Sequence, residues 1–378
     1  MIPRSVFTEE HNMFRDSVRK FMQREIQPHW EEWEAQGHIS REAWLKAGEA
    51  GILCTHIPEE YGGAGVDFRY SAIAIEEQGY VFASGPGFSL HSDIVAPYIL
   101  HYGSEEQKQK WLPKMCTGEV ITAIAMTEPG TGSDLAGVRT TATEDGDHYV
   151  INGSKTFITN GQMADLYIVV AKTDTSAGAK GVSLFLVEAD RAGFSRGQNL
   201  KKVGMKAQDT SELFFDNVRI PKENLLGQRN AGFIYLMQEL AQERLSVAII
   251  GAAAARACYD ATVTYVKERK AFGKPVASFQ NTRFKLAEIR TELEVTQCYV
   301  DRCLELHCEG KLSIDAAASV KLWATEAQCR IIDECVQLHG GYGYMWEYPV
   351  ARAYADSRVQ RIYAGTSEIM KEIISRTI

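Results

Sequence analysis

The spacing of apolar residues changes twice along the chain. From residue 8 to about 118 it is helical, with Ser40 before one apolar stretch and Ser104 and Gln107 placed as a helix-capping box. From about 120 to 220 there are short β-rich runs between Gly, Asp, Asn and Thr clusters: ITAIAM, HYVING, LYIVVAK, GVSLFLVEA and ELFFDNVRI. Long helical stretches return at about 231–268, 278–309, 313–338 and from about 366.

These blocks predict an α+β protein of three domains that pack together. We expect an N-terminal all-helical domain at 1–120, a middle β domain at 121–228 built as a small barrel or sandwich, and a C-terminal four-helix bundle at 229–378. No GxGxxG sequence joins a strand to a helix, which argues against a Rossmann nucleotide site.

Composition and charge restrict the class of partner. The 378 residues are 45% hydrophobic and carry a net charge of -8, the wrong sign for a protein that binds nucleic acid or anionic lipid. The longest apolar run, between Arg244 and Arg256, is shorter than the roughly 20 residues of a membrane span. The N-terminus lacks the apolar region of a secretory signal. We expect a cytoplasmic protein, or a mitochondrial matrix protein if a transit peptide has been removed.

The eight cysteines contain no CxxC pair, and several lie in apolar helical patterns. We interpret them as reduced core thiols. Cys303, His307 and Cys308 are the nearest approach to a metal-ligand cluster, but a structural zinc needs a fourth ligand and tighter paired spacing. The sequence therefore predicts no metal site.

Two segments are rich in glycine and hydroxyl side chains: AMTEPGTGSDLAG at 125–137 and QLHGGYGYMWEYP at 337–349. Such segments bring backbone N–H groups close to a ligand, although each alone is also explained as a turn. Together with KTFITNG (155–161), RKAFGKP (269–275) and IYAGTSE (362–368), they resemble the acyl-CoA dehydrogenase family over nearly the whole chain. The resemblance implies bound FAD, usually a homotetramer, and electron-transfer flavoprotein as oxidant.

The resemblance also implies which residues bind FAD. One set lies along the flavin, with Thr159 bonded near flavin N5 and Ser133 also near the CoA phosphates: Met126, Thr127, Gly132, Ser133, Phe157, Ile158 and Thr159. A second set contacts the pyrophosphate and adenine of FAD in a neighbouring subunit: Arg269, Phe272, Gln280, Gln337 and Gly341. Thr366 and Glu368 are implied contacts as well. A guanidinium suits a pyrophosphate, although Arg269 is also explained as a helix-end charge.

The reaction of the family, oxidation of an acyl-CoA thioester to its trans-2-enoyl form, needs a base for the Cα proton and an acceptor for the Cβ hydrogen. Many relatives place the base as the Glu of YEGT, but here that position is Ala364. Relatives of the long-chain and isovaleryl types carry it on a bundle helix, at the position of Glu243. The alternatives are that Glu243 is a solvated helix charge and that Glu368 is the base.

The resemblance implies that Ala364 acts through its backbone N–H and not through its side chain. Its N–H, with a ribityl hydroxyl of FAD, binds the thioester carbonyl and stabilises enolate charge, while flavin N5 accepts hydride. We expect burial against substrate and flavin to raise the pKa of Glu243. The resemblance also points to substrate contacts: Ser133, Met237, Leu240, Arg244, Tyr363 and Gly365.

Several points stay open from the sequence. Met237 and Leu240 are equally explained as bundle core. The acyl chain is expected to be medium to long, with an isovaleryl-like branched preference as the alternative. A flavin oxidase or monooxygenase on the same fold, and an inactive acyl-CoA or FAD binding protein suggested by Ala364, are the competing functions.

Overall fold

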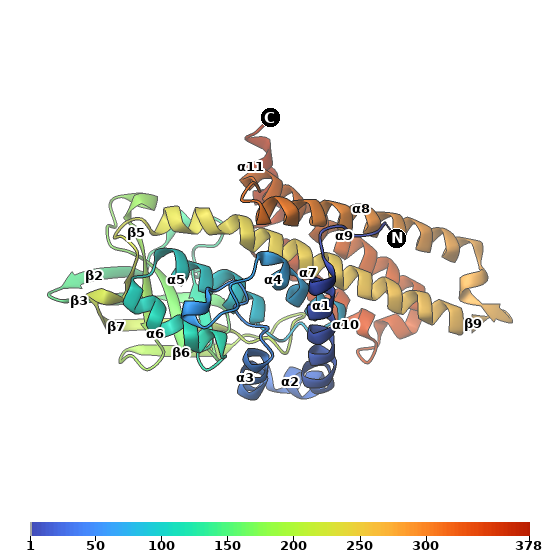
Figure 1. The fold of residues 1–378 in the computed structure, drawn as a ribbon, viewed down its shortest axis with the longest axis horizontal. Coiled ribbons are helices and arrows are strands. Elements are labelled where there is room, and N and C mark those ends of the chain that lie inside the picture. The colour runs from blue at the N-terminus through green and yellow to red at the C-terminus, as the bar shows by residue number, and fades with distance from the viewer. Residues whose placement is uncertain (1) are drawn as a thin grey trace.

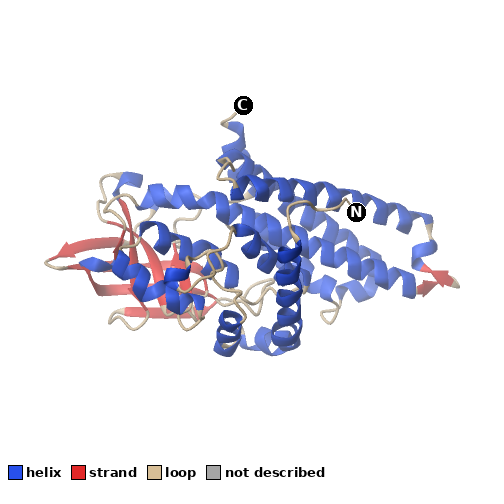
Figure 2. Ribbon diagram, in the orientation of Figure 1, coloured by secondary structure: helices blue, strands red, loops and turns tan. Residues whose placement is uncertain are grey.

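The computed structural model describes residues 2–378 and confirms the α+β fold, with helices at both ends of the chain and strands between them (Figures 1 and 2). Ser40 caps the third helix, and Ser104 and Gln107 form the predicted capping box at the sixth. The N-terminal helices are α1 (Glu9–Phe21), α2 (Trp30–Gln36), α3 (Arg41–Glu49), α4 (Phe68–Tyr80), α5 (Ala96–Tyr102) and α6 (Glu105–Cys116). A π-helical segment, η4 (Leu90–Val95), leads directly into α5.

The middle of the chain forms an eight-stranded sheet in the order β6-β7-β3-β2-β4-β5-β8, with β1 parallel to β4 off this path. Strands β4 and β5 are almost fully buried, whereas β2 and β6 are largely exposed and polar, so the hydrophobic pattern did not reveal the latter two. The strands are β1 (Thr122–Ala125), β2 (Thr141–Asp145), β3 (His148–Thr159), β4 (Leu166–Lys172), β5 (Val182–Glu188), β6 (Phe194–Asn199), β7 (Thr210–Pro221) and β8 (Leu225–Leu226).

Five helices follow the sheet. The longest, α7, begins beside the sheet and runs to the far end of the bundle, where a small hairpin of β9 (Lys270–Ala271) and β10 (Lys274–Pro275) turns the chain back (Figure 1). Helix α10 was not predicted, because it is short and follows a glycine-rich segment. The helices are α7 (Gly232–Glu268), α8 (Gln280–Cys308), α9 (Ile314–His339), α10 (Pro349–Ser357) and α11 (Ser367–Ser375).

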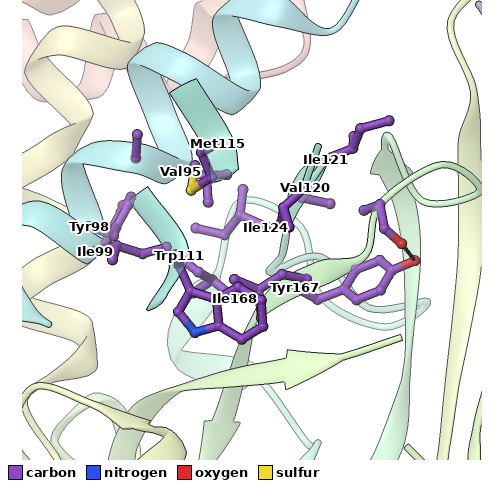
Figure 3. Packing of buried hydrophobic residues seen from close by; sticks show 14 of the residues in the cluster. Val95, Tyr98, Ile99, Trp111, Met115, Val120, Ile121, Ile124, Tyr167 and Ile168 are labelled. Atoms are coloured by element: carbon purple, nitrogen blue, oxygen red, sulfur yellow. Dashed lines mark hydrogen bonds between the residues drawn. The ribbon is translucent and has the colours of Figure 1, made fainter. Parts of the chain in front are cut away.

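One hydrophobic core joins the N-terminal helices to the sheet (Figure 3). Side chains of η4, α5 and α6 interdigitate with those of β1 and β4, so α5 is held firmly against the sheet. The residues that the figure labels are Val95, Tyr98, Ile99, Trp111, Met115, Val120, Ile121, Ile124, Tyr167 and Ile168. Because α5 also contacts α7, this core fixes where α5 meets the bundle.

All eight cysteines are free thiols, but the expectation that they lie in the core is wrong for Cys298, which is exposed, and holds only in part for Cys308 and Cys329, which are half-buried. Within residues 2–378, no helix is long and apolar enough to cross a membrane, and no group of three or more His, Cys, Asp or Glu side chains is arranged to hold a metal ion.

Candidate active site

A cavity of about 340 Å³ lies where the three parts of the chain meet. Its lining comes from α4, η4, the end of β1, the end of β3, α7, α9, α10 and the turn before α11. Most of the lining is apolar, so a carboxylate placed here is removed from water.

Helix α7 contributes one face to this cavity. Leu240, Glu243, Val247, Ile250 and Ala254 recur at spacings of three and four residues and cover about 21 Å of helix. Leu240 therefore lies on the lining, as the resemblance implies. The opposite wall includes Gly79 of α4, where an added Cβ would lie 3.1 Å from the side chain of Ile250. The glycine lets the two helices approach closely.

Glu243 is a buried carboxylate on the lining of this cavity, with 4% of its surface exposed. Its Oε1 accepts a hydrogen bond of 3.1 Å from the hydroxyl of Tyr98. Burial raises the pKa of Glu243 to about 7, against the opposing effect of the Tyr98 hydrogen bond, and Glu239 adds to the rise. The alternative that Glu243 is a solvated helix charge is therefore wrong.

Glu368, the other carboxylate considered as base, is exposed and does not line the cavity. Its pKa is lowered by a hydrogen bond to its own backbone and by the hydroxyl of Thr366. Thr366 in turn caps α11 by accepting a hydrogen bond from the N–H of Ile369. These two residues organise the start of α11, at the edge of the site.

The turn before α11 places Tyr363, Ala364 and Gly365 on the cavity wall. Ala364 has a φ of 51°, a left-handed conformation that a non-glycine residue adopts only when its surroundings hold it there. Lys321 of α9 helps to stabilise this conformation, because its Nζ donates a hydrogen bond of 2.7 Å to the carbonyl of Gly365. Lys321 is fully buried, and desolvation lowers its pKa to about 8, with Arg244 acting in the same direction.

Sequence reasoning missed Lys321, although a lysine inside the apolar run of α9 is an available signal. It also missed a buried pair beside the first glycine-rich segment. Lys155 of β3 donates to Glu128 at 2.9 Å and to the carbonyl of Met126 at 3.0 Å. Glu128 also accepts from the N–H groups of Arg139 and Thr140. This pair fixes the backbone that leaves β1.

Six of the seven residues expected along the flavin line the same cavity as Glu243: Met126, Thr127, Gly132, Phe157, Ile158 and Thr159. The carbonyl of Thr127 accepts from the N–H of Thr156, which holds the two segments side by side. Phe157 has a φ of 59° and exposes 68% of its surface, although it is a large apolar side chain. The seventh residue, Ser133, is exposed and does not contribute to the lining.

The second expected set lies elsewhere. Arg269, Gln337 and Gly341 line an open cavity of about 560 Å³, where the guanidinium of Arg269 lies 5.5 Å from the ring centre of Tyr342. Phe272 is almost fully exposed in the hairpin at the end of the bundle, and Gln280 is exposed at the start of α8; neither lines this cavity. Arg269 follows Glu243 by about 39 Å of helix, so one chain does not bring the two sets together.

Two residues expected to contact substrate also lie off the first cavity. Met237 packs against the core that joins the helices to the sheet. Arg244 is buried beside Glu243, and desolvation lowers its pKa against the raising effect of that carboxylate. Its Nε has no hydrogen-bond partner among the described residues.

Comparison with known proteins decides the family. Models of the acyl-CoA dehydrogenase N-terminal, middle and C-terminal domains match residues 8–119, 123–218 and 230–378. The chain belongs to the acyl-CoA dehydrogenase family. It is an FAD-dependent oxidoreductase of the type that dehydrogenates acyl-CoA thioesters.

Its relatives cover nearly the whole chain. The mitochondrial long-chain specific acyl-CoA dehydrogenase of Sus scrofa is 56% identical over 99% of this chain and 88% of its own length. The mitochondrial isovaleryl-CoA dehydrogenase of Oryza sativa subsp. japonica is 38% identical over 99% of this chain and 92% of its own length. The crystal structure of an acyl-CoA dehydrogenase from Geobacillus kaustophilus superposes with a TM-score of 0.97, at 52% identity and 99% coverage of both chains.

The residues around both cavities fit FAD. An exposed aromatic ring at Phe157, beside backbone of β1 and β3, is the kind of surface that a planar heterocycle covers. In the second cavity, Arg269 forms no ion pair within residues 2–378, so its charge is available to a phosphate. Gly340 and Gly341 leave open space where side chains would otherwise obstruct a ligand.

Proposed function

We propose that this acyl-CoA dehydrogenase oxidises a medium-to-long-chain acyl-CoA to its trans-2-enoyl-CoA, with Glu243 as the general base. The observation that carries the assignment is a buried carboxylate, its pKa raised to about 7, in the cavity that Ala364 also lines. A base whose pKa lies near working pH is ionised often enough to accept a proton and basic enough to hold it.

In this proposal Glu243 removes the Cα proton of the thioester. The N–H of Ala364 donates to the thioester carbonyl oxygen and stabilises the negative charge that develops there, which makes the Cα proton more acidic. When bound, FAD would supply the acceptor for the Cβ hydrogen and its electron pair, which the oxidation to a Cα–Cβ double bond requires. The apolar walls of α4 and α7 exclude water from the carboxylate.

The binding roles follow the two cavities. The flavin ring is assigned to the first cavity, between the segment after β1 and the end of β3. The pyrophosphate is assigned to Arg269 of an adjacent subunit, because the two sets of residues are separated along α7. This assignment requires at least a dimer, and we propose the homotetramer that is usual in the family.

The preference for longer acyl chains is supported by two observations. The groove between α4 and α7 is apolar along several turns of helix, and the relatives with 55 to 56% identity are named as long-chain specific. The isovaleryl-CoA dehydrogenases that match are 37 to 38% identical. We therefore place a branched short acyl chain second.

The decisive experiment is anaerobic mixing of the FAD-loaded protein with acyl-CoA thioesters of increasing length, followed by flavin bleaching. Wild-type protein should bleach most rapidly with medium-to-long chains. Glu243→Gln should bleach at least 1,000-fold more slowly with the best of them, because the other carboxylate on the cavity lining, Asp356 of α10, is already engaged by the N–H of Met205. Glu239→Gln, one turn away on α7 and off the lining, is the matched control and should remain within a few fold of wild type.

A near wild-type rate in Glu243→Gln would show that the base is wrongly assigned. Bleaching by none of the thioesters in wild-type protein would instead favour an inactive binding protein. Ala364→Glu in the Glu243→Gln background asks whether a carboxylate on the opposite wall of the same cavity restores bleaching, as it should if both positions reach the same Cα.

The electron acceptor is tested on the reduced enzyme. We propose that it passes electrons to electron-transfer flavoprotein and reacts slowly with oxygen. Mixing reduced enzyme with aerated buffer, with and without that flavoprotein, separates the dehydrogenase from a flavin oxidase. Rapid reoxidation by air alone would contradict the proposal.

A further inference from the structure

Tyr98 of α5 is a fully buried tyrosine whose hydroxyl reaches the carboxylate of Glu243. Its ring belongs to the core between the N-terminal helices and the sheet (Figure 3). A phenylalanine would fill this space equally well. The hydroxyl instead points to a buried carboxylate on the cavity lining and lies 3.1 Å from Oε1 of Glu243.

The two carboxylate oxygens of Glu243 have different surroundings. Tyr98 donates to Oε1, whereas no described residue donates a hydrogen bond to Oε2. A tyrosine has few rotatable bonds, and this ring is clamped by the core, so its hydroxyl is a fixed point. The carboxylate is thereby restrained on one side and free on the side of the cavity.

We propose that Tyr98 is a positioning residue for the general base, holding Oε1 of Glu243 so that Oε2 faces the α carbon of the thioester, and stabilising the ionised carboxylate. This inference rests on the proposed function of Glu243. Nothing in the resemblance or the sequence pattern assigns a role to Tyr98.

The other charged and titratable groups around Glu243 do not replace this contact. On α7, Glu239 is a like charge one turn away, and its carboxylate is engaged by Tyr102 and His101 of α5. Arg244 is the neighbouring cation on α7 and makes no hydrogen bond with Glu243.

From the other elements, Lys321 of α9 bonds the carbonyl of Gly365, and the hydroxyl of Tyr363 bonds Gln360. Among the described residues, Tyr98 is therefore the one hydrogen-bond donor to Glu243. Burial raises the pKa of Tyr98 well above its ordinary value, so the hydroxyl keeps its proton and remains a donor throughout the working pH range.

Tyr98→Phe tests the proposal by removing one oxygen atom and leaving the ring in place. The rate of flavin reduction rises with pH as the base ionises, and in the variant this rise should move upward by about one to two pH units. At pH 7 the rate should fall roughly 5- to 50-fold and should recover above about pH 9. Tyr102→Phe is the matched control, because it removes a hydroxyl from the same helix that bonds Glu239 instead.

A second measurement is independent of turnover. Infrared titration of the FAD-loaded protein without substrate follows the carbonyl band of protonated Glu243, identified as the band that is missing in Glu243→Gln. In Tyr98→Phe this band should persist to higher pH than in wild type, and in Tyr102→Phe it should titrate as in wild type.

An unchanged band and an unchanged rate profile in Tyr98→Phe would overturn the proposal, as would an equal displacement in Tyr102→Phe. The proposed function fails separately. If Glu243→Gln reduces flavin at the wild-type rate while the band still moves in Tyr98→Phe, then Tyr98 holds a carboxylate that is not the base.

Discussion

At the scale of single residues, burial of Glu243 has opposite effects on reactivity and on stability. Its pKa in the folded protein is raised from the ordinary 4.5 to about 7, chiefly by desolvation. The unfolded chain therefore loses this proton at lower pH than the folded chain does. Folding stability falls as pH rises from about 4.5 to 7 and stays reduced above that range.

Glu243→Gln should accordingly be more stable than wild type at pH 8, by the order of 2 kcal/mol, and close to wild type at pH 5. Midpoints of thermal unfolding at the two pH values check this prediction. A variant that is less stable than wild type at pH 8 would show that the carboxylate is better solvated than its burial indicates.

The sequence pattern identified the two glycine-rich segments, and the resemblance to the family identified Glu243. Neither identified Tyr98 or Lys321, because each makes its contact with a residue that is far away in the sequence: Tyr98 with Glu243, and Lys321 with Gly365. From the sequence alone, a buried tyrosine in α5 is indistinguishable from a residue of the hydrophobic core, because its contact with Glu243 of α7 is visible only in the structure. Periodicity describes which face of a helix is buried, not what that face meets.

At the scale of elements, the turn between Tyr363 and Thr366 depends on α9. Lys321→Met keeps the length of the side chain but removes the charged hydrogen bond to Gly365. The left-handed Ala364 then loses a constraint, so its N–H should be less well aimed. We expect kcat for flavin reduction to fall at least tenfold while the thermal midpoint changes little, because the variant also removes a buried charge.

Lys371→Met is the control for this prediction. Lys371 is an exposed lysine on α11, the helix that directly follows this turn. Stopped-flow reduction at saturating substrate measures kcat separately from KM. A fall in the thermal midpoint as large as that of a core deletion would assign Lys321 to folding and not to the turn.

Elements were more predictable than contacts. Apolar periodicity predicted helices α7, α8, α9 and α11 and the buried strands. It did not predict β2 and β6, because their side chains are mostly polar and exposed. Helix α10 escaped because one short amphipathic turn after GGYGY resembles a loop. The domain boundaries at 120 and 228 remain predictions of the pattern.

At the scale of the whole molecule, a buried ion network ties the N-terminus to the bundle. Arg4 bonds Glu76 of α4 and Asp301 of α8, and Arg15 also pairs with Glu76. Despite desolvation, which raises it, the pKa of Glu76 is lowered overall by Arg4 and Arg15. The stabilisation from Glu76 is therefore present above its ordinary pKa of 4.5 and is lost as pH falls below it.

Arg4→Met should lower the stability by roughly 1–3 kcal/mol at pH 7, since it leaves two buried carboxylates with fewer partners, although Arg4 itself is partly exposed. The loss should be smaller at pH 4. Arg376→Met breaks an exposed pair on α11 and is expected to change the thermal midpoint very little. If Arg4→Met and Arg376→Met changed the thermal midpoint equally, the ion network around Arg4 would not stabilise the fold.

Assembly gives a further prediction at this scale. If each FAD spans the first cavity of one subunit and the partner's Arg269, Glu243→Gln and Arg269→Gln should each be inactive alone but should complement each other when co-expressed. Random pairing of the two chains in a two-fold dimer should restore roughly a quarter of wild-type activity. Failure of the mixture, with both chains folded and associated, would mean that Arg269 serves its own subunit.

The left-handed conformation of Ala364 decides which substitutions that position tolerates. At position 364 the proposed work is done by the peptide N–H, which every residue except proline possesses, and not by the side chain. Any residue other than proline at position 364 would therefore keep this donor, provided that it can adopt the left-handed φ, which glycine does most easily and β-branched residues least.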